Sequence, residues 1–180
     1  GHHRDDQIET FLIRLSRGSG IQGLSSMSKV SSLSNTTKLF RPLLDEKKEN
    51  LIFLAKYYFG KIFKDPSNTN QKYLRTKIRN LIKRFEKSGI KPDRIINSIN
   101  NLASTRDTLN FYTERIEKNC VIKKNNTISI NLKKFFLENN EIQLKIFSNS
   151  IKKISKNYYP PRAKKVLNLL SRVRSNESPK

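Results

Sequence analysis

Hydrophobic residues recur at helical spacing near the start of the chain. The stripe consists of Ile8, Phe11, Leu12 and Leu15. This spacing predicts a first helix over residues 5–17, for which Gly18 is a natural stop. A stretch rich in glycine and serine then predicts a loop to about residue 36. The β-prone residues 36–43 predict a short strand that Pro42 ends.

Two more helices are predicted before the middle of the chain. Asp45 is placed to cap the first of them. The apolar residues of that helix are Leu51, Leu54, Tyr58, Ile62 and Phe63. Residues 64–70, KDPSNTN, are typical of a turn. The next helix, over residues 70–87, has a basic exposed face and ends at Gly89.

The second half of the chain is predicted to be mostly helical, beginning with a long helix that Pro92 opens. Its buried stripe is expected to comprise Ile95, Ile99, Leu102, Leu109, Tyr112 and Ile116. Near residues 121–131, the segments VIKK and TISI flank an Asn-Asn pair, which favours a short hairpin. Two or three basic helices follow, one of them after the Pro-Pro pair at 160–161. The tail from Ser175 is expected to be disordered.

Composition limits the class of protein. With 180 residues, 35% of them hydrophobic and none of them Trp, the chain can bury one good core or two modest ones. No apolar run approaches the roughly 20 residues of a membrane-spanning helix, and no signal peptide is evident. We therefore expect a soluble, cytoplasmic protein without a membrane partner. The single cysteine, Cys120, excludes a disulfide framework and a cysteine-based zinc site, and it is expected to be a plain buried thiol.

The charge of the chain points to a polyanionic partner. The 37 Lys and Arg residues outnumber the 15 Asp and Glu residues, which gives a formal net charge of +22 and a pI near 10.3. Nine basic residues fall within residues 72–94, and nine more, with no acid, within residues 145–174. Such clusters favour contact with a phosphate backbone. An AT-rich coding sequence would instead scatter lysines over every solvated face, and the clustering argues against it as the whole explanation.

The opening residues, GHHRDD, allow two interpretations. Imidazole and carboxylate groups both bind divalent cations, but His2 and His3 are adjacent, whereas a zincin needs two histidines one helical turn apart. No other histidine follows, which argues against a self-contained metal hydrolase. Alternatively, Asp5 and Asp6 cap the helix N-terminus and complement its dipole. That account leaves the histidines, Gln7 and the glycines unexplained.

Residues 1–27, GHHRDDQIETFLIRLSRGSGIQGLSSM, resemble the second signature of the tRNA(Ile)-lysidine synthase family, HHxDDQxETxLxRLxRGSGxxGLxxM. The resemblance continues through FRPLL and DPSNTN to Arg75 and Arg79, which have the spacing of the family's RNxxR element. These two arginines lie one helical turn apart, so both can face the same phosphates. The segment NYYPPRAKKVLNLL is similar to a YPPR segment of the family's helical domain. Residues 117–157 match in general character only.

The resemblance implies both a fold and an activity. Residues 1–89 would be the C-terminal part of a Rossmann-like PP-loop ATPase domain, and residues 90–180 a mainly helical tRNA-binding domain, so the fold class runs from α/β to mainly α. The implied activity is the ATP-dependent ligation of free L-lysine to C2 of the wobble cytidine of an isoleucine tRNA, which gives lysidine. In the family, ATP first adenylates the cytidine and the lysine amine then displaces AMP, so ATP and Mg²⁺ are the implied cofactors.

The same resemblance implies a set of site residues. The catalytic residues would be His2, His3, Asp5, Asp6, Gln7, Glu9 and Arg17. Asp5 and Asp6 would bind Mg²⁺ or orient the lysine ammonium, whereas the histidines and Arg17 would contact phosphates or the cytidine. The tRNA-binding residues would be Arg41, Asp65, Asn68, Arg75, Arg79 and Arg162. For Asp65 and Asn68, a structural role in a turn is an equally good explanation.

One element of the family is absent from these 180 residues. The ATP-binding loop SGGxDS precedes the HHxDDQ signature in the family, and the sequence contains neither this loop nor GxxxxGK[ST]. The only methionine is Met27. We therefore expect a piece of a longer enzyme that is inactive alone. Two other functions stay open: a non-catalytic basic RNA-binding protein and another PP-loop tRNA-modifying enzyme, although one cysteine argues against a thiolase. The oligomeric state, a homodimer included, is also open.

Overall fold

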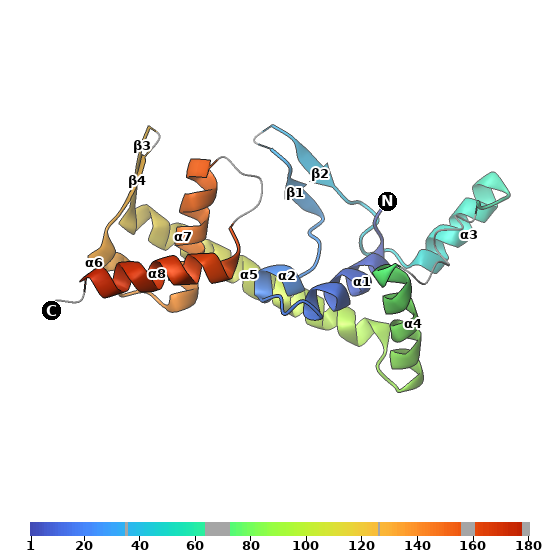
Figure 1. Ribbon diagram of the computed structural model, residues 1–180. Coiled ribbons are helices and arrows are strands. Elements are labelled where there is room, and N and C mark those ends of the chain that lie inside the picture. The colour runs from blue at the N-terminus through green and yellow to red at the C-terminus, as the bar shows by residue number, and fades with distance from the viewer. Residues whose placement is uncertain (35, 64–72, 126, 156–160, 178–180) are drawn as a thin grey trace. The chain divides into compact units, whose positions relative to one another are not determined.

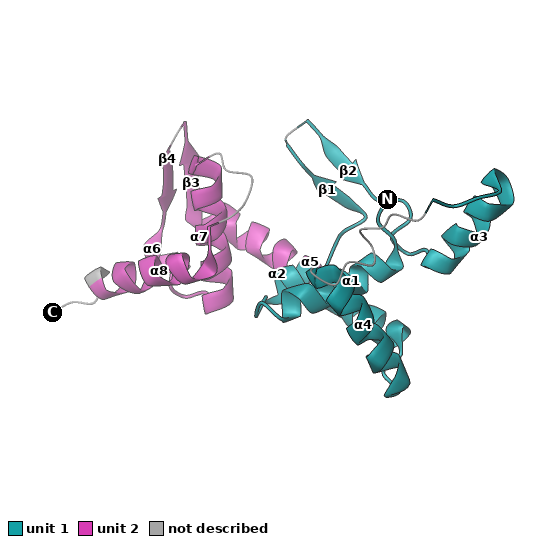
Figure 2. Cartoon of the chain, turned by 45° about the vertical axis from the view of Figure 1, so that its right-hand side comes forward, with its two compact units in different colours: residues 1–106 teal, residues 107–180 magenta. Residues whose placement is uncertain are grey.

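The computed structural model describes residues 1–34, 36–63, 73–125, 127–155 and 161–177 (Figure 1). The chain divides into two compact units, unit 1 with residues 1–106 and unit 2 with residues 107–180 (Figure 2). The division falls inside a long helix, and the expected domain boundary between residues 89 and 90 stays a prediction. None of the described helices is both long enough and apolar enough to span a bilayer.

Unit 1 combines helices with one small ribbon. Its elements are α1 (Arg4–Leu15), α2 (Ile21–Leu24), β1 (Val30–Ser32), β2 (Lys38–Phe40), α3 (Lys48–Phe59), α4 (Leu74–Lys87) and the first part of α5 (Pro92–Cys120). Strands β1 and β2 pair in antiparallel fashion, so that Val30 lies opposite Phe40.

The core of unit 1 lies between α1, α4 and α5. It consists of Ile8, Leu12, Ile78, Ile95 and Ile99. On α1 and on α5 the buried residues are four positions apart, which is the spacing of one helical face. Burying one such aliphatic side chain contributes about 1.5–3 kcal/mol, so this cluster fixes α1, and with it the HHRDD segment, against α4.

Unit 2 continues from the end of α5 through a hairpin and three helices. These elements are β3 (Val121–Lys124), β4 (Thr127–Ile130), α6 (Leu132–Phe135), α7 (Asn140–Ser155) and α8 (Ala163–Glu177). Strands β3 and β4 pair from Val121 opposite Ile130 to Lys124 opposite Thr127. The core comprises Cys120, Phe135, Ile142, Ile146, Val166 and Leu170. Cys120 is therefore a buried thiol, as its isolation in the sequence predicted.

Most of the predicted elements are confirmed, with shifted ends. The first helix, the strand before Pro42, the basic helix that stops at Gly89, the long helix from Pro92 and the hairpin are all present. Gly89 has a φ of 93°, a left-handed conformation that suits glycine and ends α4. The predicted turn at 64–70 lies outside the described residues.

Several expectations about unit 1 are wrong. The predicted loop to residue 36 contains α2 and β1. Asp45 does not cap a helix, because α3 starts only after Lys47 and Asp45 forms an ion pair with Lys29. The helix ends at Phe59, where Gly60 adopts a φ of 71°. Ile62 and Phe63 consequently lie beyond the helix, and no residue of α3 is buried.

Two expectations about the later helices are also wrong. Tyr112 was assigned to the buried stripe of α5 but is 51% exposed, because its neighbour Thr113 takes the buried position. The tail from Ser175 was expected to be disordered, whereas α8 continues to Glu177.

Candidate functional site

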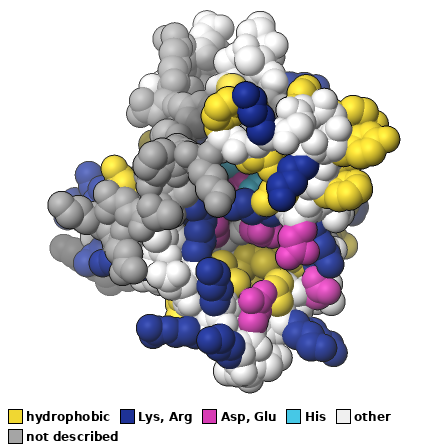
Figure 3. Space-filling model, turned by 90° about the vertical axis from the view of Figure 1, so that its right-hand side faces the viewer, with side chains coloured by type: hydrophobic (Ala, Val, Ile, Leu, Met, Phe, Trp, Pro, Cys, Tyr) yellow, Lys and Arg dark blue, Asp and Glu magenta, His cyan; other side chains and the backbone are white. Residues whose placement is uncertain are grey.

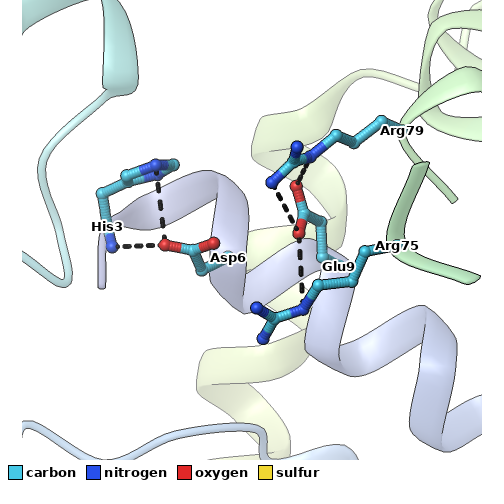
Figure 4. A network of polar contacts seen from close by, with 5 residues as sticks. All are labelled: His3, Asp6, Glu9, Arg75 and Arg79. Atoms are coloured by element: carbon cyan, nitrogen blue, oxygen red, sulfur yellow. Dashed lines mark hydrogen bonds and ion pairs between the residues drawn. The ribbon is translucent and has the colours of Figure 1, made fainter. Parts of the chain in front are cut away.

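The HHRDD segment forms the first turn of α1. His3 is the N-cap residue, and its backbone N–H donates a hydrogen bond of 2.9 Å to Oδ2 of Asp6. The imidazole Nε2 of His3 lies 3.5 Å from the same oxygen (Figure 4). Buried Asp6 thus closes the first turn of the helix, which is the capping role that one interpretation of the sequence gave to the acids. Asp5 is half-buried and takes no part in this cap.

Gln7 and Arg14 hold the glycine-rich loop against α1. The side-chain amide of Gln7 donates to the carbonyl oxygen of Met27 and accepts from its N–H, each at 2.8 Å. Arg14 donates to the carbonyl oxygens of Gly23 and Ser26 at 2.8 and 3.0 Å, and burial lowers the pKa of its guanidinium. Sequence reasoning missed Arg14, although its spacing of seven from Gln7 places both on one helix face.

Two glycines of this loop are required by its geometry. Gly18 has a φ of 67°, and a Cβ on Gly23 would lie 2.6 Å from the Cβ of Ser19. Next to them, the buried hydroxyl of Ser25 accepts a 3.0 Å hydrogen bond from Arg106 on α5. The GSGIQGLSSM segment, which contains α2, is therefore held in place by contacts within the chain, while Arg17 just before it is exposed.

Glu9 is a buried carboxylate held between two arginines of α4. Arg79 donates from Nε to Oε1 at 2.5 Å and from Nη2 to Oε2 at 3.5 Å, and Nε of Arg75 lies 3.9 Å from Oε2 (Figure 4). The hydrogen bond from Arg79 to Glu9 raises the pKa of Arg79. The arginines do share one helix face, as their spacing predicted, and that face meets a carboxylate of this chain. Their contact with tRNA stays a prediction.

A cleft of about 820 Å³ opens in unit 1 beside α1 and α4. Its acidic lining residues are Asp5, Glu9, Glu49, Glu86 and Asp93, and its basic ones are Arg4, Lys47, Lys48, Arg79, Lys83 and Lys91. On the face drawn in Figure 3, side chains of both signs surround a hollow with an apolar floor. Because both charges are available, the cleft can accept an ammonium group and a phosphate or carboxylate together.

The remaining predicted residues are spread over other places. Arg41 donates to the carbonyl oxygen of Ser28 and the hydroxyl of Ser31, both at 3.0 Å, so it braces the β1–β2 ribbon. His2 is half-buried beside the N-cap. Arg162 is exposed just before α8 in unit 2. Asp65 and Asn68 lie outside the described residues.

The described side chains form no ready-made metal cage. No group of three or more His, Cys, Asp or Glu among them is arranged to hold a metal ion. Mg²⁺ at a phosphate-transfer site usually takes only one or two carboxylates, with substrate phosphates and water as its other ligands. Asp6 accepts a hydrogen bond from the His3 N–H, whereas Asp5 lines the cleft. Of these two carboxylates, Asp5 is therefore the one that fits the role of a Mg²⁺ ligand.

Comparison with known proteins finds a domain model that matches the first part of the chain and relatives that match nearly all of it. Residues 1–85 match the model of the PP-loop domain. Over 178 residues, 98% of this chain and 41% of the relative, the chain is 36% identical to tRNA(Ile)-lysidine synthase of Wolbachia pipientis wMel. The same enzyme of Wolbachia sp. subsp. Brugia malayi (strain TRS) is 38% identical over 96% of the chain and 40% of the relative. The chain thus spans about two fifths of the length of these relatives.

Proposed function

We propose, from the membership of this chain in the tRNA(Ile)-lysidine synthase family of PP-loop proteins, that it forms part of an enzyme that joins lysine to the wobble cytidine of an isoleucine tRNA. The observation that carries the proposal is the set of contacts that the acidic residues of the HHRDDQIET segment make. Asp6 closes the N-terminal cap of α1, and Glu9 pairs with the arginines of α4. Asp5 has neither of these roles and lines the cleft.

The cleft has the charges that the reaction needs. ATP would adenylate the C2 oxygen of cytidine and release pyrophosphate; the lysine nitrogen, after losing a proton to water, would then bond to C2 as that oxygen leaves with AMP. Asp5, at the positive end of the α1 dipole, holds Mg²⁺ or the lysine ammonium. Lys47, Lys83 and Lys91 on the cleft wall attract phosphates. Asp6 and Glu9 act as positioning residues, because they fix the first turns of α1 and so the direction of Asp5.

The exposed basic residues serve tRNA binding in this proposal. Arg75 has a side chain that is 53% exposed although its Nε faces Glu9, so its terminal nitrogens can reach a phosphate. In unit 2, the exposed lysines at 152, 164 and 165 continue the second basic cluster. A non-catalytic RNA-binding protein would share these helices, but it would not depend on the Asp5 carboxylate in the cleft. Loss of activity at Asp5 therefore separates the two functions.

The test uses a joined protein, in which the part of the Wolbachia pipientis relative that lies N-terminal to its matched residues precedes this chain. Transfer of labelled lysine to isoleucine tRNA is measured with ATP and Mg²⁺. Asp5→Asn should reduce the rate ~100-fold or more, as for other groups that stabilise charge in a transition state. The matched control is Asp45→Asn, whose carboxylate pairs with Lys29 outside the cleft lining, and it should change the rate less than about twofold. Full activity of Asp5→Asn would refute the role of Asp5, and absence of transfer by the parent joined protein would refute the function.

A further inference from the structure

Helix α5 exposes two aromatic rings in unit 2 while it buries polar residues beside them. Residues 107–120 of this helix belong to unit 2 (Figure 2). Thr113 and Glu117 are buried there, whereas Phe111 and Tyr112 are 63% and 51% exposed. Buried polar side chains and exposed clusters of apolar ones are the informative exceptions to ordinary burial. Because such exceptions are expected at functional sites, the two rings are assigned to a partner and not to the core.

The two rings form a corner on the surface of the helix, with cations beside them. Their centroids lie 5.5 Å apart, and their planes make an angle of 82°. A flat group that stacks on one ring is therefore perpendicular to the other ring. Exposed Arg115 follows Phe111 by four positions and Tyr112 by three, so it lies one helical turn further along the same face. Exposed Lys118 lies a second turn along, seven positions after Phe111.

We propose that this face of α5 binds an unpaired nucleotide of the tRNA, with its base stacked on Phe111 or Tyr112 and its phosphate held by Arg115. The choice of tRNA as the partner rests on the proposed function. Proteins bind single-stranded RNA through aromatic side chains that stack on the bases, next to cations that contact the backbone. A guanidinium group suits the phosphate because it can donate two parallel hydrogen bonds to it.

The charge of unit 2 favours an unpaired RNA over other occupants of this face. Residues 107–180 contain 16 Lys and Arg residues but only six Asp and Glu residues. This excess attracts a polyanion and opposes the approach of a second copy of the chain. The bases of a duplex are already stacked on each other, so a duplex cannot use the rings, whereas unpaired bases can. Ring-dependent preference for unpaired RNA is therefore the property that identifies the site.

Fluorescence anisotropy tests the site with the 180-residue chain and two labelled RNAs of equal length, one unpaired and one a duplex. The double variant Phe111→Ala with Tyr112→Ala should weaken binding of the unpaired RNA at least ~5-fold, because it removes the stacking surface. Binding of the duplex, which depends on its phosphates, should change less than about twofold. Isoleucine tRNA, which has unpaired loops, should follow the unpaired RNA. Unchanged binding of the unpaired RNA, or equal weakening for both RNAs, would overturn the proposal.

Two further variants control for the loss of the rings. Phe53→Ala with Tyr57→Ala removes the same two types of ring from α3, where they are 68% and 74% exposed, and should change the affinity less than about twofold. Phe111→Tyr with Tyr112→Phe keeps both aromatic surfaces, so it should keep the affinity of the parent chain. A loss of affinity in this exchanged variant as large as in the double alanine variant would contradict stacking.

Salt dependence separates the phosphate contact from the stacking contact. Arg115→Gln should reduce the slope of log affinity for unpaired RNA against log salt by about 0.7 units, while the double alanine variant should leave the slope unchanged. A double alanine variant that abolishes self-association of the chain, with RNA binding intact, would assign the face to a second copy and overturn the proposal. The binding assays contain no ATP or lysine. Ring-dependent binding without lysine transfer by the joined protein would therefore keep the site and remove the proposed function.

Discussion

Removing either partner of the Glu9–Arg79 ion pair should destabilise unit 1 by different amounts. The Glu9 side chain is 3% exposed, whereas that of Arg79 is 29% exposed. In Arg79→Gln the carboxylate stays buried and, among the described residues, keeps the long 3.9 Å ion pair with Arg75. In Glu9→Gln the guanidinium can turn toward water and can still donate to the new amide oxygen. We therefore expect Arg79→Gln to cost more.

The magnitude follows from burial. Breaking a fully buried ion pair by removing one partner costs about 3–5 kcal/mol. For Arg79→Gln, the partial exposure of Arg79 and the remaining ion pair with Arg75 reduce this cost to about 2–3 kcal/mol. Glu9→Gln should lose about 1 kcal/mol, which is the net value of one hydrogen bond. About 1.4 kcal/mol corresponds to a factor of ten in an equilibrium constant. The opening equilibrium constant of unit 1 should therefore rise about 30-fold or more in Arg79→Gln and about 5-fold in Glu9→Gln.

Native-state hydrogen exchange on the α1 and α4 amides is the suitable assay, since it reports opening of unit 1 without interference from unit 2. The exposed Lys77→Gln on α4 changes the same charge without touching Glu9, and it should leave the exchange rates within about twofold. Equal exchange rates in Arg79→Gln and Glu9→Gln, or faster exchange in Glu9→Gln, would refute the inference that the buried Glu9 carboxylate needs Arg79 to balance its charge.

Three other expectations concern pH, salt and thiol chemistry. Burial alone would raise the pKa of Glu117, but the ammonium groups of Lys153 and Lys123 hold that pKa below its usual value. Unit 2 should therefore lose stability as the pH falls below about 4.5 and through the lowered pKa, and acid titration by circular dichroism should show no such loss in Glu117→Gln. Arg75→Ala should reduce the slope of log affinity for tRNA against log salt by about one unit, and an unchanged slope would remove Arg75 from the interface. Burial raises the pKa of the Cys120 thiol, so maleimide should label it at neutral pH only when unit 2 opens, and rapid labelling of the folded chain would contradict its place in the core.

Local patterns predicted most of the helices because their signals lie within a few residues. The stripe of α1, Pro92 at the start of α5 and the Asn-Asn turn of the hairpin are of this kind. Strand β1 was missed because its three residues, VSS, gain their structure only by pairing with β2. The helical character of α3 was predictable from its apolar spacing, but the exposure of its side chains was not, since exposure depends on packing between distant segments.

The candidate site was predicted as a set of residues but not as an arrangement. The motif placed Glu9 with the catalytic residues and Arg79 with the tRNA-binding ones, whereas their side chains meet across 70 positions of sequence. Gln7 and Arg14 bind backbone carbonyl oxygens, which every residue has, so the residue types of the partner segment could not predict these hydrogen bonds. The catalytic and tRNA-binding assignments remain predictions for the assays above.

The nucleoside composition of isoleucine tRNA tests the central claim most directly. The tRNA is incubated with the joined protein, ATP, Mg²⁺ and lysine, digested to nucleosides and analysed by mass spectrometry. The account predicts lysidine in place of the wobble cytidine, formed only when lysine is present. A sulfur-containing nucleoside, or an unmodified wobble cytidine, would contradict it.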